Sequence, residues 1–153
     1  MNNLQEKFNL IRILSSKEAS GLLAKKNLGH LGCSVGDEPY VVPVTYALEG
    51  DFIYSHSPEG KKIEIMRKNP NVCLQVEEAE GLFQWRSVIA RGRFEELKGD
   101  PAAAGMRVLL NRLRLEPKHI SSLEMDFEAM LERSIIYRIK IERLTGRAAG
   151  GVN

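Results

Sequence analysis

The stretch FIYSHSPEGKKIEIMRKNPNVCLQVEE, residues 52–78, joins two strand-like segments through one short helix. Residues 52–57 begin with aromatic and β-branched side chains, which favour a strand. The sequence PEG at 58–60 breaks that strand, and the lysine-rich run 61–68 ends just before a proline, where helical backbone is disfavoured. Apolar and polar residues then alternate from 71 to 78, which predicts a second strand with one buried face.

Strand patterns continue on both sides of this stretch. Segments 30–35, 40–48, 84–97 and 134–144 bring the predicted strands to six. Three residues including a glycine separate 40–48 from 52–57, so we expect these two runs to form a hairpin. Pro43 lies within the first run and cannot donate a ladder hydrogen bond, which predicts an edge strand or a bulge there.

Helices are predicted singly between the strands. Ser15 and Glu18 form a capping box for a helix that ends near residue 29. Asp100-Pro101 is typical of an N-cap followed by a first-turn proline, opening a helix through about residue 115. A second capping box predicts a short helix over 121–132. No βαβ alternation is present, so the sequence predicts a mainly β fold with peripheral helices, built as a small, partly open antiparallel barrel.

Length and charge narrow the class of protein. The chain has 153 residues, 22 basic and 20 acidic side chains and a net charge of +2. One domain over 1–153 is expected, with a core at about 10–146 and a flexible tail over 147–153. The balanced charge argues against nucleic-acid binding. No apolar run of membrane-spanning length and no secretory signal is present, so we expect a cytoplasmic protein.

The cysteines and histidines do not predict a metal site. Cys33 and Cys73 lie in separate strand-like segments and are interpreted as free thiols. The three histidines are scattered. His56 lies in a Ser-His-Ser setting, but no acidic residue is placed to orient it, which argues against a Ser/His hydrolase. Arg91 and Arg93 alternate on one strand face, which favours a solvated or dimer-facing pair.

The predicted start of helix 61–68 is the strongest candidate site. Gly60 would allow a ligand to approach the backbone closely. Lys61 and Lys62 fall in the first turn, where cations oppose the helix dipole, whereas an anion bound there would reverse that cost. Ser55 and Ser57 lie just upstream. The pattern indicates a phosphate site, with a pair of solvated surface lysines as the alternative.

Three sequence blocks carry a family resemblance: PYVVPVTY at 39–46, IYSHSPEGKKI with RKNPNVC over 53–73, and WRSVIARGR at 85–93. In this order and spacing they resemble the FMN-binding split barrels related to pyridoxamine 5′-phosphate oxidase. The nitroimidazole-resistance (Nim) branch is the most similar, over about residues 10–146. The resemblance implies a six-stranded split β-barrel and a homodimer that binds FMN at the subunit interface.

The resemblance also implies which residues contact the cofactor. The isoalloxazine ring would lie along the 43–45 segment, and the phosphate would be held at 60–62. Residues 55–56 would lie near the ribityl chain, and residues 85–87 would come from the next strand. The implied cofactor-binding set is Pro43, Val44, Thr45, Ser55, His56, Gly60, Lys61, Lys62, Trp85, Arg86 and Ser87. His56 would also face the substrate and is the one candidate catalytic side chain.

The expected activity is that of an FMN-dependent oxidoreductase acting on a small organic molecule, including nitroaromatic compounds such as 5-nitroimidazoles. The sequence has no counterpart of the oxidase's substrate-binding C-terminal segment, which disfavours pyridoxine phosphate oxidation. FAD is an alternative cofactor and heme a less favoured one. A flavin or heme carrier without turnover is the alternative function, and neither the natural substrate nor the electron donor follows from the sequence.

Overall fold

The computed structural model describes residues 10–113 and 133–150. In chain order its elements are β1 (Ile11–Ile13), α2 (Ser16–Lys25), β2 (Leu28–Val35), β3 (Glu38–Thr45), β4 (Ala47–Glu49), β5 (Phe52–Ser57), α3 (Lys61–Lys68), β6 (Asn71–Gly81), β7 (Gln84–Leu97), α4 (Asp100–Arg112) and β8 (Ile135–Ala149). The helix predicted over 121–132 lies outside the described residues. Among the described residues no helix is long and apolar enough to span a membrane.

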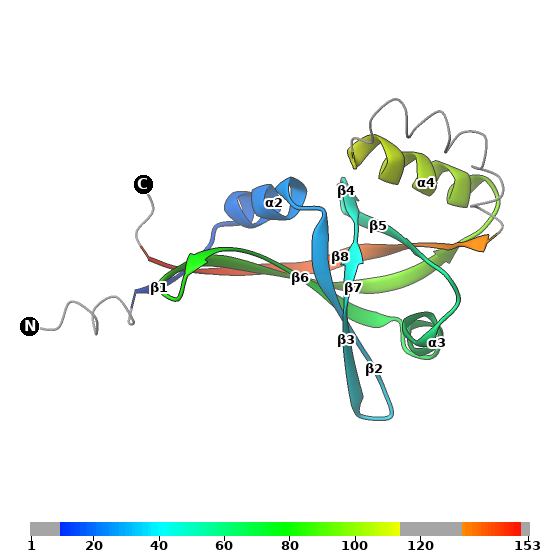
Figure 1. Ribbon diagram of the computed structural model, residues 1–153, viewed down its shortest axis with the longest axis horizontal. Helices are drawn as coiled ribbons and strands as arrows, with labels where there is room; N and C mark the ends of the chain where they lie inside the picture. Colours follow the sequence, from blue (N-terminus) through cyan, green and yellow to red (C-terminus); the bar gives the residue numbers. More distant parts are fainter. Residues whose placement is uncertain (1–9, 114–132, 151–153) are drawn as a thin grey trace, which may run out of the picture.

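All the strands belong to one antiparallel sheet in the order β3-β2-β6-β7-β8-β5-β4, and β1 pairs with the far end of β8. The sheet curls but does not close, because β3 and β4 occupy its two ends (Figure 1). This is the mainly β split barrel with peripheral helices that the sequence predicts. The strand count differs: eight strands are described where six were predicted, because run 40–48 is divided and β1 is added.

Tyr46 divides the run 40–48. Its side chain is fully buried, its hydroxyl donates to the carbonyl oxygen of Leu23 at 2.6 Å, and its amide donates to Asn27. The predicted hairpin with β5 therefore forms only along β4, with three residue pairs. β3 instead pairs along its length with β2, around a turn at Gly36-Asp37 where both φ angles are positive. Pro43 lies on an edge strand, as predicted.

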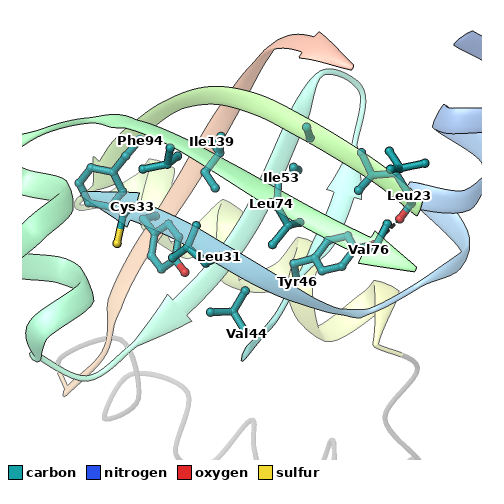
Figure 2. Close-up of a cluster of buried hydrophobic side chains, with 14 of the residues drawn as sticks. Leu23, Leu31, Cys33, Val44, Tyr46, Ile53, Leu74, Val76, Phe94 and Ile139 are labelled. Carbon is teal, nitrogen blue, oxygen red and sulfur yellow. Dashed lines mark hydrogen bonds between the residues drawn. The ribbon is translucent and has the colours of Figure 1, made fainter. Parts of the chain in front are cut away.

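The core fills the inside of the curled sheet. Inward side chains of β2, β3 and β5–β8 interdigitate there, and Figure 2 shows Leu31, Val44 and Leu74 among them. α2 covers one end through Leu22 and Leu23, and its predicted capping box between Ser15 and Glu18 is present. α4 packs outside β4 and β5 in a smaller cluster with Ala47 and Ile136; the helix begins at Asp100 and its N-cap is Gly99, one residue earlier than predicted.

The expectation of a flexible tail over 147–153 is wrong for residues 147–149, which belong to a strand. β8 continues to Ala149 and pairs with both β7 and β1. Ala148 and Ala149 are buried, and a Cβ built on Gly146 would lie 2.8 Å from a methyl carbon of Leu14. Small residues are thus required where Leu14 packs on the strand. Cys33 and Cys73 are free thiols, as predicted.

Candidate functional site

The candidate phosphate site lies at the start of α3. Gly60 is the N-cap residue and offers no side-chain hydrogen bond, so the first amides of the helix have no capping side chain. Lys61 is exposed, with its Nζ 5.2 Å from the ring centroid of Tyr40 on β3. Lys62 is half-buried. Neither lysine forms an ion pair within the described residues. Two unpaired cations and uncapped amides together form a site suited to an anion.

Gly60 contributes space rather than an unusual backbone conformation. Its φ of 176° is extended backbone that any residue adopts. A Cβ built there would meet only the carbonyl oxygen of Pro58, at 4.0 Å. The expectation that a ligand can approach the backbone closely at Gly60 is therefore compatible with the structure, since the position is open.

Ser55 and Ser57 point into the barrel instead of toward a ligand. Both are buried. The Ser55 hydroxyl donates to the carbonyl oxygen of Thr45 at 2.7 Å, and the Ser57 hydroxyl donates to Pro58. Because β3 and β5 are not paired strands, the Ser55 contact fixes the end of β3 against β5. Ser55 thus positions Thr45 rather than presenting its own hydroxyl.

Tyr137 lies beside Ser55 inside the barrel. Its ring is fully buried, and burial raises the pKa of its hydroxyl to about 12. Within the described residues that hydroxyl has no hydrogen-bond partner. Tyr137 was not among the sequence candidates; its apolar strand setting indicates only a core residue.

His56 lies on the opposite face of β5 from Ser55, since successive strand residues alternate. It is half-buried, and burial lowers its pKa, with the nearby Lys62 ammonium acting in the same direction. A lowered pKa favours the neutral ring, so His56 can accept or share a hydrogen bond at neutral pH. Its contribution to stability is complete above its unfolded-state pKa and is lost as the pH falls through its folded-state pKa.

We expect the substitution Lys62→Ala to raise the pKa of His56, because one of the two causes of its depression is removed. Binding of a phosphate dianion beside Lys62 should also raise the pKa of His56. NMR titration of the His56 C2 proton, in the wild type and in the substituted protein, measures both effects. A His56 titration unaffected by the substitution would mean that burial alone sets its pKa.

A second group of predicted residues lies on the outer face of the sheet, defined here as the face of β1, β2, β3, β6, β7 and β8 directed away from the core. Pro43 and Thr45 of β3 are exposed there, whereas Val44 points into the core and could offer only its backbone. Ser87 of β7 shares this face, and its hydroxyl accepts from Gln75 Nε2 at 3.0 Å. Gln75 and Tyr40 were missed by sequence reasoning, because their neighbours come from strand pairings distant in sequence.

Trp85 and Arg86 face opposite ways on β7. Trp85 is half-buried on the Ser87 side, beside Ala79 and Ala149. The Arg86 guanidinium lies on the other side, where it donates to Glu78 Oε1 at 2.8 Å. Glu78 also binds Lys25 and Lys26 of α2, and these hydrogen bonds hold its pKa at about 2. The structure therefore does not place Arg86 with the other predicted cofactor residues.

A groove of about 530 Å³ runs along the outer face from Pro39 and Val41 of β3 to β7 and β8. Its floor includes Gly32 and Cys73, and Arg91 and Glu142 lie at its far end. The ring of Tyr40 lies on the core side of β3 with Val42 and Val44, so its contact with Lys61 is on the other side of the strand from the groove. The candidate phosphate site at α3 and the surface groove of mixed polarity are thus two separate features of the structure.

The unclosed antiparallel barrel defines a split-barrel protein, and the uncapped helix start with two lysines is its candidate anion site. The chain belongs to the pyridoxamine 5′-phosphate oxidase family, whose model matches residues 15–148.

Related proteins match nearly the whole chain. An uncharacterised protein of Rhizobium meliloti is 34% identical over 145 residues, covering 91% of this chain and 95% of the relative. A crystal structure of an FAD-binding protein from Mesorhizobium loti is 35% identical with a TM-score of 0.71, covering 93% and 98%. A candidate 5-nitroimidazole antibiotic resistance protein from Bacteroides thetaiotaomicron is 18% identical with a TM-score of 0.77, covering 90% and 87%, and at that identity it supports the fold alone.

Proposed function

We propose that the protein is a flavin-dependent oxidoreductase acting on a small organic molecule, with FMN or FAD as its cofactor. The observation that carries this proposal is the pair Lys61 and Lys62 at the uncapped start of α3, without an ion pair among the described residues. Membership of the family and the FAD-binding relative at 35% identity support it.

In this arrangement the flavin would supply the redox chemistry, and the protein would bind and orient it. Lys61, Lys62 and the first amides of α3 would hold the phosphate. Thr45 and the backbone at 43–44 would border the ring, with Ser55 keeping Thr45 in place through its hydrogen bond. The neutral His56 ring would lie at the phosphate side, where it can accept a hydrogen bond.

We further propose a homodimer in which the outer face meets its counterpart and encloses the cofactor. Three large apolar side chains on this face support the proposal: Ile13, Leu28 and Val41 are 71%, 61% and 64% exposed. Apolar surface of this kind marks an interface when it gathers on one side of a molecule. Trp85 lies on the same face and would contribute an aromatic anchor.

The finer substrate assignment is reduction of nitroaromatic compounds, including 5-nitroimidazoles. Its support is the fold shared with the Bacteroides thetaiotaomicron protein and the absence of an obligatory general base among the proposed contacts, which suits hydride transfer. A flavin or heme carrier without turnover is the second candidate, because tight binding at the same site requires no substrate.

A visible spectrum of the freshly purified protein separates these functions. Bands at about 370 and 450 nm are expected for a bound oxidised flavin. A Soret band in their place would indicate heme, and a featureless spectrum after incubation with FMN and FAD would refute flavin binding. Bleaching by NADH or NADPH, followed by reoxidation with a nitroimidazole, would identify a reductase; bleaching without substrate turnover would identify a carrier.

A further inference from the structure

Four cationic side chains lie together on the outer face, where β7 pairs with β8. Arg91 is directly opposite Arg143, and Arg93 is directly opposite Lys140. All four are exposed. Like charges directly opposite each other in antiparallel strands destabilise the pairing. The sheet therefore contains two neighbouring unfavourable pairs at this place, which we call the arginine corner.

The same strands pair opposite charges elsewhere. Glu95 of β7 lies opposite Arg138 of β8 and accepts from its Nε at 2.7 Å. Within residues 10–113 and 133–150, no ion pair includes a member of the arginine corner. Glu142 is the additional residue in β8 where the register with β7 shifts, and it lines the same groove as Arg91. Glu95, two residues beyond Arg93, is paired with Arg138 instead.

The arginine corner borders the outer-face groove. Arg91 and Glu142 line one end of it, and Pro39 and Val41 of β3 line the other. Gly32 leaves room for the Cys73 side chain between them, since a Cβ built on Gly32 would lie 2.9 Å from the sulfur. One molecule in the groove could therefore contact β3 with one end and Arg91 of the arginine corner with the other.

We propose that the arginine corner binds the phosphate group of a nucleotide whose remaining part lies in the groove. Guanidinium groups form paired hydrogen bonds with phosphate oxygens, and a dianion between them turns both like-charge pairs into favourable contacts. A single carboxylate would leave most of this charge unbalanced. The source of the phosphate is an NADPH donor, because the two phosphates of FAD share one bridging oxygen and would both lie at the start of α3. The inference rests on the proposed flavin site, which it deepens.

The test compares two proteins. One is the double variant that carries both Arg91→Gln and Arg143→Gln, and the other is the control Lys17→Gln, which removes an exposed cation on α2. Calorimetric titrations use the flavin-free protein with FMN, FAD and 2′,5′-ADP, and reduction kinetics use NADPH and NADH. The donor subsite predicts that the KM for NADPH rises about tenfold, the KM for NADH stays constant and 2′,5′-ADP binding is lost, while FMN and FAD binding are unchanged.

Several results would overturn the subsite. The first is unchanged binding and kinetics in the double variant, and the second is an equal loss of FMN and FAD binding. The third is a double variant that is monomeric where the wild type is a dimer, which would show that the cations face the partner subunit. The melting temperature should not fall, because the variant removes like-charge pairs. If the wild type binds no flavin, the proposed function is lost. Binding of 2′,5′-ADP then tests the subsite separately. Saturable binding that the double variant abolishes supports the subsite, and the absence of binding to the wild type refutes it.

Discussion

Replacing Gly92 with alanine should destabilise the protein by about 3 kcal/mol or more. Gly92 is buried in β7, at the place where β8 accommodates the additional residue Glu142. A Cβ built there would collide with the carbonyl oxygen of Lys140 and lie 2.8 Å from a methyl carbon of Ile139. The carbonyl belongs to the backbone, so it can withdraw only if β7 and β8 separate, and these strands form the longest pairing in the sheet.

Urea unfolding followed by the fluorescence of Trp85, the single tryptophan, measures this effect. Gly21→Ala is the matched control, because Gly21 is exposed in α2 and a Cβ there has no neighbour within 4 Å. That control should stabilise the protein by about 0.5–1 kcal/mol through helix propensity. If Gly92→Ala unfolds within about 0.5 kcal/mol of the wild type, the register shift relaxes easily and the steric argument is wrong.

The position of Gly92 also shows what the sequence could and could not predict about the fold. Alternating apolar residues predict β6, β7 and most of β8, because a half-buried strand has a side-chain period of two. The additional residue at Glu142 changes which side chains of β8 face inward, and no local pattern marks it. Beyond it, the buried residues are Gly146, Ala148 and Ala149, which resemble a loose tail until Leu14 and β1 pack against them.

The candidate site was predictable where its signal is local. Lysines in the first turn of a helix contradict the helix dipole, and this mismatch identifies Lys61 and Lys62 without any tertiary information. Strand alternation likewise predicts that Ser55 and His56 face opposite ways. Tyr40, Gln75 and the Arg91–Arg143 pair depend on which strands are neighbours, so single-sequence patterns do not identify them.

The double variant Lys61→Ala with Lys62→Ala should lose about 3 kcal/mol or more of flavin binding, or about 100-fold in Kd, since charge-assisted hydrogen bonds contribute about 1.5–3 kcal/mol each. The fold should survive, because Lys61 is exposed, Lys62 is half-buried and neither forms an ion pair in the described part of the chain. Removing first-turn cations should even relieve an unfavourable helix-dipole contact of about 0.3–1 kcal/mol each in the free protein.

Lys68→Ala provides the control at the other end of α3, where a cation is favourable to the helix dipole and far from the proposed phosphate. Flavin affinity should be unchanged in this variant, while its helix should be slightly less stable. Titration of flavin fluorescence, together with urea unfolding of the flavin-free proteins, separates the two effects. The double variant should bind flavin weakly yet unfold no earlier than the wild type. If the wild type, the double variant and Lys68→Ala all bind flavin equally well, the start of α3 does not hold the phosphate.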